Sequence, residues 1–281
     1  MLLKLLKYDI KAIWKIALLV SIASVGAGLI GGAGFRVFYE GATGTAESPF
    51  YIVGFFAFLM SFFAIAAANA VISIFVFMRF YKNLFTDEGY LTFTLPVSRR
   101  TVLLSKTLNS LIWFVVSLVV AALSMAMYIP FMPLDSSEFV MGVKDMLSLF
   151  GYVSESMNIW NYIQLVLAAL SVIVGSVFGI CLIQLCISLG AMLVKKGKLL
   201  IGILFYFIIN SVIQFAAQIG GIIVSLLYEG LFGYGSAGYG TVGADIFLTV
   251  VVFVVFILTA VLMFLSYFFT QRIIDRKLNL A

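Results

Sequence analysis

The sequence of 281 residues contains no histidine, only two cysteines and few charged residues, which make up 10% of the chain. Without histidine the chain lacks the commonest metal ligand and the commonest general base. Cys181 and Cys186 lie in one apolar stretch, on different faces of a helix, so we expect them to pack rather than form a disulfide. We therefore expect no metal site, no cofactor bound by this chain and no enzyme active site.

Few charges also argue against a soluble protein. Soluble domains carry about 25% charged residues, whereas this chain is 64% hydrophobic and has a mean hydropathy of +1.19. A bilayer core about 30 Å thick is crossed by roughly 20 apolar residues in a helix. Six runs without Asp, Glu, Lys or Arg are close to this length or exceed it: 17–33, 50–78, 108–131, 159–194, 199–228 and 246–270. The sequence predicts an all-α polytopic membrane protein with six transmembrane helices.

The basic residues gather in alternate connecting segments, which predicts the orientation. Four segments hold 15 of the 17 basic residues, namely Lys4, Lys7, Lys11, Lys15, Arg79, Lys82, Arg99, Arg100, Lys106, Lys195, Lys196, Lys198, Arg272, Arg276 and Lys277. Only Arg36 and Lys144 lie in the other segments, together with most of the acidic residues. Because cytoplasmic segments are enriched in Lys and Arg, we expect the N-terminus and the C-terminus to be cytoplasmic. Topology thus accounts for the net charge of +5 without a nucleic-acid partner.

We expect one transmembrane domain over residues 1–281. Residues 1–15 alternate apolar and basic positions, which is typical of an amphipathic helix at the membrane interface. An ordinary basic flank that only orients the first span explains the same residues, and a cleaved signal peptide is a further alternative. Residues 132–158 form the longest external loop, where an apolar-periodic patch predicts a short surface helix.

The cytoplasmic loop 79–107 is much longer than the other cytoplasmic loop, at 195–198. Thr86 precedes Asp87 and Glu88, which predicts a helix start with a hydroxyl cap and acids at the positive end of the helix dipole. Pro96 should end that helix, and Ser98 should cap the next one. The pattern predicts a short helix across the cytoplasmic ends of spans two and three.

Glu88-Gly89, then Leu95-Pro96-Val97-Ser98-Arg99 and then Lys106 resemble the cytoplasmic segment of type-2 ABC transporter permeases. The six spans, the basic amphipathic start and the very short second cytoplasmic loop are also similar to that family. The resemblance implies the permease subunit of an ABC exporter in a bacterial plasma membrane, with the short helix coupled to a cytoplasmic ATPase subunit. The implied coupling residues are Asp87, Glu88, Gly89, Tyr90, Pro96, Ser98 and Arg99.

The resemblance also implies a second permease subunit, identical or related, and ATP with Mg²⁺ held by the partner ATPase. The chain itself has no G-x-x-x-x-G-K-[ST] run. A short, glycine-rich fifth loop differs from polysaccharide-exporting members and argues against a large polymer as cargo. Two alternatives stay open. An ion-coupled secondary transporter is disfavoured because no ionisable residue lies within an apolar run. A membrane sensor or scaffold would use the same loop to bind a partner.

A polar stripe runs along the fifth span. Tyr206, Asn210, Gln214 and Gln218 recur at intervals of four and lie on one slowly drifting face of a helix. Amides facing lipid are costly, so the stripe should face protein or water. It either lines a translocation pathway for an amphipathic cargo or forms hydrogen bonds between helices.

Two glycine pairs at G-x-x-x-G spacing predict close helix contacts. Gly28 and Gly32 lie in the first span, and Gly175 and Gly179 lie in the fourth. Small residues at this spacing let helix backbones approach each other in membranes. The chain has 24 glycines, so the pattern indicates packing and only weakly a dimer seam.

Overall fold

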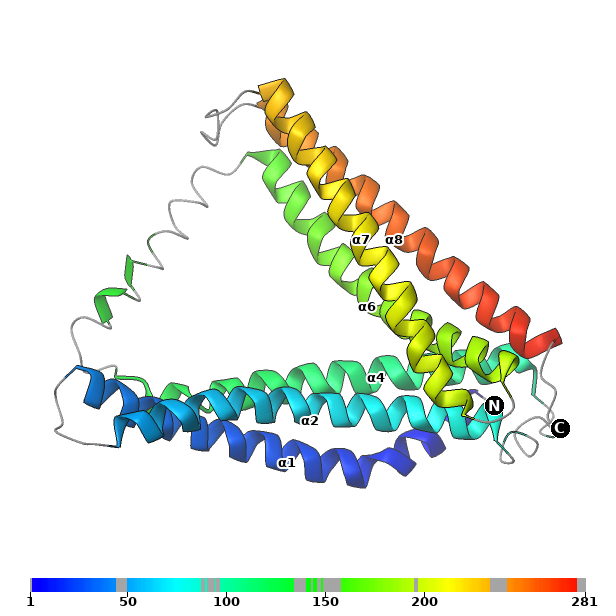
Figure 1. Cartoon of the computed structure of the whole chain (residues 1–281), viewed down its shortest axis with the longest axis horizontal. Helices are drawn as coiled ribbons and strands as arrows, with labels where there is room; N and C mark the ends of the chain where they lie inside the picture. The colour runs from blue at the N-terminus through cyan, green and yellow to red at the C-terminus, as the bar shows by residue number, and fades with distance from the viewer. Residues whose placement is uncertain are drawn as a thin grey trace. The chain divides into compact units, whose positions relative to one another are not determined.

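The computed structural model (Figure 1) describes residues 2–43, 50–86, 89, 94, 97–133, 140–142, 144–145, 148, 158–194, 197–232 and 242–276. The elements are α1 (Leu2–Ala42), α2 (Tyr51–Phe85), α4 (Arg99–Ala126), the 3₁₀ turn η1 (Ile129–Phe131), α6 (Ile159–Leu193), α7 (Lys198–Phe232) and α8 (Val242–Arg276). The described residues contain no strand. Six helices are long and apolar enough to cross a membrane, so the prediction of an all-α chain with six spans is confirmed.

Five of the six helices are longer than the apolar runs that predict them, and α6 matches its run. Helix α1 has 41 residues, which corresponds to about 60 Å of helix, or roughly twice the thickness of a bilayer core. It begins at Leu2, so the amphipathic segment is helical and continuous with the first span. Leucine and lysine are good helix formers, which is why the helix does not stop where the apolar run does.

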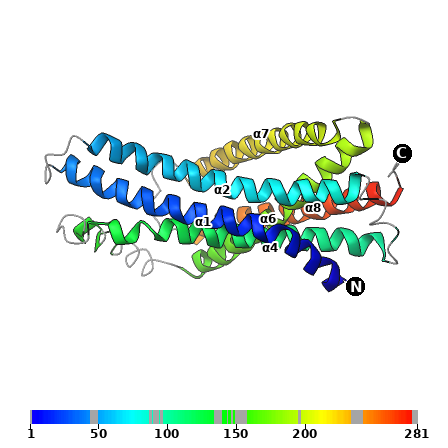
Figure 2. The same cartoon turned by 90° about the horizontal axis from the view of Figure 1, so that it is seen from below.

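The chain divides into two compact units. The first comprises Met1–Phe80 and Thr101–Leu147, and the second comprises Tyr81–Arg100 and Ser148–Ala281. In the first unit α1, α2 and α4 run side by side in both views (Figures 1 and 2). The second unit contains α6, α7 and α8, and also the described residues between Tyr81 and Arg100.

Close backbone contact joins α1 to α4 in the first unit. A Cβ added at Gly28 would lie 2.2 Å from the carbonyl oxygen of Ser124, and one added at Gly32 would lie 2.5 Å from Cδ2 of Phe131. The hydroxyls of Ser24 and Ser124 are hydrogen-bonded at 2.9 Å in the same contact. The predicted role of this glycine pair in helix packing is therefore confirmed.

The apolar core of the first unit lies between all three of its helices. Its buried members are Ile13, Ala17, Ile72, Val76 and Trp113. The side chains come from α1, α2 and α4, so the three helices form one packed body rather than a row of pairs. Such a body gives the end of α2 and the start of α4 a fixed support.

In the second unit α6 packs against α8 and α7. A Cβ added at Gly190 would lie 2.5 Å from the main-chain nitrogen of Gly202, so α6 and α7 are in backbone contact beside their short connection. On α6, Cys181 and Cys186 are buried free thiols. The expectation for the second glycine pair differs from the structure: a Cβ at Gly175 or Gly179 would meet no described atom within 4 Å.

A polar network joins the other ends of α6 and α8. The side-chain amide of Gln164 donates to the main-chain oxygen of Asp245 at 2.8 Å and to Oγ1 of Thr249 at 3.1 Å. Asn158 Nδ2 also donates to the Asp245 carboxylate at 3.3 Å. Most of the segment 132–158 lies outside the described residues. The described residues of the predicted surface helix are helical, namely Val140, Met141, Gly142, Lys144, Asp145 and Ser148.

Candidate functional site

The predicted coupling residues lie between α2 and α4. Gly89, Ser98 and Arg99 are described, whereas Asp87, Glu88, Tyr90 and Pro96 lie outside the described residues. Gly89 is buried, and Ser98 directly precedes α4, in the position that a helix cap occupies. The predicted restart of the helix at Ser98 therefore agrees with the start of α4 at Arg99.

Thr86 follows the last residue of α2 and was predicted to begin the next helix. Its hydroxyl makes a contact that the sequence did not indicate. It donates to the carbonyl oxygen of Lys82, one turn earlier in α2. The Gly89 N–H donates at 2.7 Å to the main-chain oxygen of Thr86. A threonine hydroxyl commonly bonds back to the carbonyl four residues earlier, and here the end of α2 offers an unpaired one. Thr86 thus closes α2.

Arg99 ties the end of the loop to the end of α8. Its Nη1 donates to the carbonyl oxygen of Ile274 at 2.8 Å and to that of Asp275 at 3.0 Å. These carbonyls belong to the last turn of α8, where no further turn supplies N–H partners. A cation at this position also interacts favourably with the negative end of the helix dipole. The family resemblance implied only a coupling role for Arg99, and did not indicate this contact.

A buried charge cluster joins the three helices of the first unit beside the same loop. Lys106 Nζ on α4 lies 2.6 Å from Oδ1 and 2.7 Å from Oδ2 of Asp9 on α1. Arg79 Nε on α2 lies 3.5 Å from the same Oδ1. Asp9 is 4% exposed and Lys106 is 8% exposed, so this pair is shielded from water and screened little by salt.

The face of α4 next to this cluster is unusually polar for a buried surface. Ser105 Oγ, Asn109 Oδ1 and Trp113 Nε1 recur at intervals of four and are buried without a hydrogen-bond partner among the described residues. Each such group costs about 1–3 kcal/mol relative to a paired one. The Asp9–Lys106 pair and the Ser24–Ser124 hydrogen bond are polar contacts between this face of α4 and α1.

The predicted stripe of the fifth span lies on α7. Tyr206 and Asn210 are half-buried, whereas Gln214 and Gln218 are exposed. The structure gives the three amides no hydrogen bond to another described residue, so the interhelical hydrogen bonds proposed for them are not present within the second unit. Exposed amides at the centre of a spanning helix require water or another protein surface.

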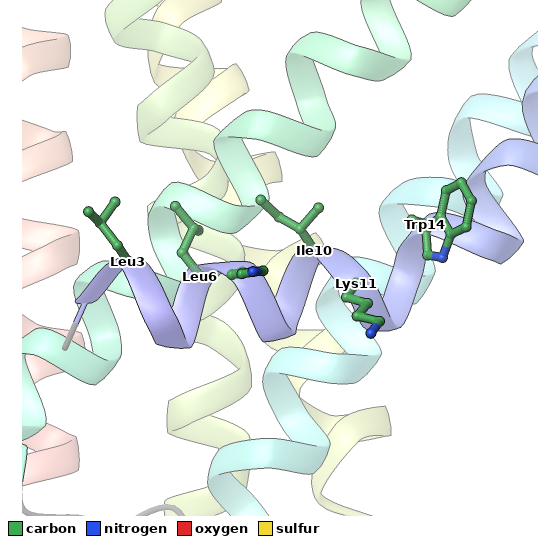
Figure 3. Close-up of a pocket in the computed structure, with 6 residues that line it drawn as sticks. Leu3, Leu6, Ile10, Lys11 and Trp14 are labelled. Atoms are coloured by element: carbon green, nitrogen blue, oxygen red, sulfur yellow. The ribbon is translucent and has the colours of Figure 1, made fainter.

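A shallow pocket of about 540 Å³ lies along the start of α1. Figure 3 shows Leu3, Leu6 and Ile10 on one side of the helix, with Lys11 and Trp14 further along it. These five side chains line the pocket together with Lys7. An apolar stripe bordered by lysines and a tryptophan is suited to the boundary between acyl chains and headgroups. The described residues contain no group of three acidic, cysteine or histidine side chains that could hold a metal.

Asp9 is not among the functional residues predicted from the sequence. A signal was present: Asp9, Ile13 and Ala17 follow one another at intervals of four, so Asp9 shares the apolar face and not the lysine face. Its partner Lys106 is 97 residues away, and no local pattern could have identified it. No family model, curated protein or solved structure matches the chain.

Proposed function

We propose that this chain is the permease subunit of an ABC exporter in a bacterial plasma membrane and that it moves an amphipathic substrate. Six apolar helices supply the membrane domain, and the absence of a phosphate-binding motif from the sequence means that a partner must hydrolyse ATP. A cytoplasmic ATPase subunit would bind ATP and Mg²⁺. A second permease subunit, identical or related, would complete the pathway.

The attachment of the cytoplasmic loop at both flanks is the observation that supports this proposal most. Arg79 and Lys106, near the two ends of the loop, both lie against Asp9. Arg99, the first residue of α4, donates to the carbonyls that end α8. A loop fixed in this way passes a displacement to α1, α2, α4 and α8, whereas a loop that served only topology would need no such attachments. ATP-driven closure of the ATPase subunits would supply the displacement.

The polar stripe on α7 is the proposed pathway surface. Gln214 and Gln218 expose neutral amides, which would interact with the polar part of an amphipathic cargo without binding a bare ion strongly. The second permease subunit and water would cover this face. Gln214→Leu together with Gln218→Leu should reduce transport and leave the ATPase subunit bound.

An ion-coupled carrier is the second candidate, because the Asp9–Lys106 pair is a buried acid and base of the kind that ion-coupled carriers use. The positions of its members favour a support role, since Asp9, Arg79 and Lys106 all lie outside the apolar runs. In sealed vesicles, such a carrier would transport with an ion gradient and without any ATPase. The exporter requires ATP and its partner subunit.

The proposal is tested with a tagged chain purified from its native membrane. We expect an ATPase subunit to copurify, and Asp87→Asn with Glu88→Gln in the loop to reduce its recovery at least several-fold. Arg36→Gln is the matched charge-neutralising control, because Arg36 pairs with Glu40 near the other end of α1. Unchanged recovery and unchanged transport in the loop variant would refute the coupling assignment.

A further inference from the structure

We propose that Asp9 is a positioning residue that holds the start of α1 to both flanks of the cytoplasmic loop, so that these three segments move together during transport. This inference rests on the proposed function and adds to it the N-terminal segment, which the family resemblance left as an amphipathic interface helix. The geometry that carries it is one carboxylate shared by cations from two other helices.

The chain positions of the two cations make the arrangement specific. Arg79 lies in the last two turns of α2, before the loop, and Lys106 lies in the second turn of α4, after it. The only acid in the first turns of α1 contacts both. If Asp9 contacted only one of the two cations, a force on the loop could move the end of α2 away from the start of α4. A shared carboxylate resists that separation and makes α1 follow.

Loss of the Asp9 charge and loss of the Lys106 charge should have different effects on the cluster. Removing the Asp9 carboxylate takes from Arg79 and Lys106 the acid that they share. Removing the Lys106 ammonium leaves Asp9 with Arg79, whose side chain is 34% exposed and partly solvated. Asp9→Asn should therefore disturb the cluster more than Lys106→Gln does, although each removes one charge from the same pair.

The attachment through Asp9 should fix the distance between the start of α1 and the start of α4. This distance can be measured without any ATPase. Spin labels placed at the exposed positions Lys4 on α1 and Leu104 on α4 report the distance between the two segments by pulsed electron paramagnetic resonance. The native thiols Cys181 and Cys186 are buried and are replaced by serine to leave two labelling sites. The chain is reconstituted alone in phospholipid vesicles.

We expect one narrow distance distribution for the parent chain and for Asp9→Glu, which keeps the charge. Asp9→Asn should at least double the width of the distribution, and Lys106→Gln should broaden it less. Glu229→Gln is the matched control for loss of one carboxylate, since it lies near the end of α7, and it should leave the distribution narrow. An unchanged distribution in Asp9→Asn overturns the inference.

A second measurement separates positioning from folding. With the ATPase subunit present, Asp9→Asn should keep the copurified ATPase but lower ATP-dependent transport by about tenfold, which corresponds to about 1.4 kcal/mol of lost coupling. Asp9→Glu should restore transport. Normal transport in Asp9→Asn despite a broadened distribution would reduce the cluster to a packing contact and overturn the inference. If no ATPase copurifies even with the parent chain, the proposed function fails, while the distance measurement still reports the attachment through Asp9.

Discussion

Gly28→Ala would place a methyl group inside the contact between α1 and α4. The added Cβ would lie 2.2 Å from the carbonyl oxygen of Ser124, 3.0 Å from its carbonyl carbon and 3.2 Å from its Cα. All three are main-chain atoms, so no side-chain rotation relieves the overlap. The two helices would have to move apart by about 1 Å to restore van der Waals distances.

The cost of that movement follows from three contributions. Overpacking of a well-packed contact costs about 1–3 kcal/mol. Separation of the helices also weakens the hydrogen bond between Ser24 and Ser124, which is worth about 0.6 kcal/mol in a membrane protein. Alanine is the better helix former by about 1 kcal/mol and offsets part of the loss. We expect Gly28→Ala to lower the free energy of unfolding by about 1–2 kcal/mol.

Gly175→Ala is the matched control, because it makes the same chemical change within another transmembrane helix. A Cβ there would meet no described atom within 4 Å, so only the gain in helix propensity remains, at most about 1 kcal/mol. Unfolding by sodium dodecyl sulfate in mixed micelles, followed by circular dichroism, compares the two variants with the parent chain. A Gly28→Ala variant as stable as Gly175→Ala would refute the close contact of α1 with α4.

Three further outcomes follow from the described contacts. Gln164→Leu should lower the free energy of unfolding by about 1 kcal/mol, measured in the same titration, because it removes both hydrogen bonds from α6 to α8. Arg99→Ala should speed amide hydrogen exchange in the last turn of α8 roughly two- to fivefold, whereas Arg100→Ala, which loses an exposed side chain, should not. Cys181 and Cys186 should resist a water-soluble maleimide until the chain is denatured, and rapid labelling of the folded chain would contradict their burial.

The six spans could be predicted because each needs only a long run without charges, which is a property of consecutive residues. The ends of the helices could not be predicted as well. Helix α1 begins at Leu2 although its apolar run begins at residue 17, since a helix can continue into a segment of lysines and leucines at little cost. The length of an apolar run reflects the thickness of the bilayer core, whereas the ends of a helix depend on caps and neighbouring segments.

The two glycine pairs show that glycine spacing alone does not predict contact with a second helix. Gly28 and Gly175 have the same spacing to a second glycine, yet only Gly28 meets another helix among the described residues. Spacing shows that one helix face is small. It does not show whether a second helix lies there, because that depends on residues far away in the sequence.

The charge cluster shows the same limit at the candidate site. The length and charge of the segment between spans two and three identify it as a candidate site. Its contacts with Asp9 and with the end of α8 could not be predicted, because they join residues far apart in the chain. The sequence did not indicate that the Thr86 hydroxyl donates to the carbonyl oxygen of Lys82, one turn earlier in α2.

Photo-crosslinking in intact cells from the loop between α2 and α4 tests the proposed function most directly. A benzophenone side chain at Tyr90 should crosslink to a protein that carries a G-x-x-x-x-G-K-[ST] motif and hydrolyses ATP when purified with this chain. The same group at Tyr51, which is exposed at the start of α2, should not capture that protein. Capture of the ATPase from Tyr90 alone is the predicted result. Equal capture from both positions, or none from Tyr90, would contradict the claim that this loop couples the chain to an ATPase.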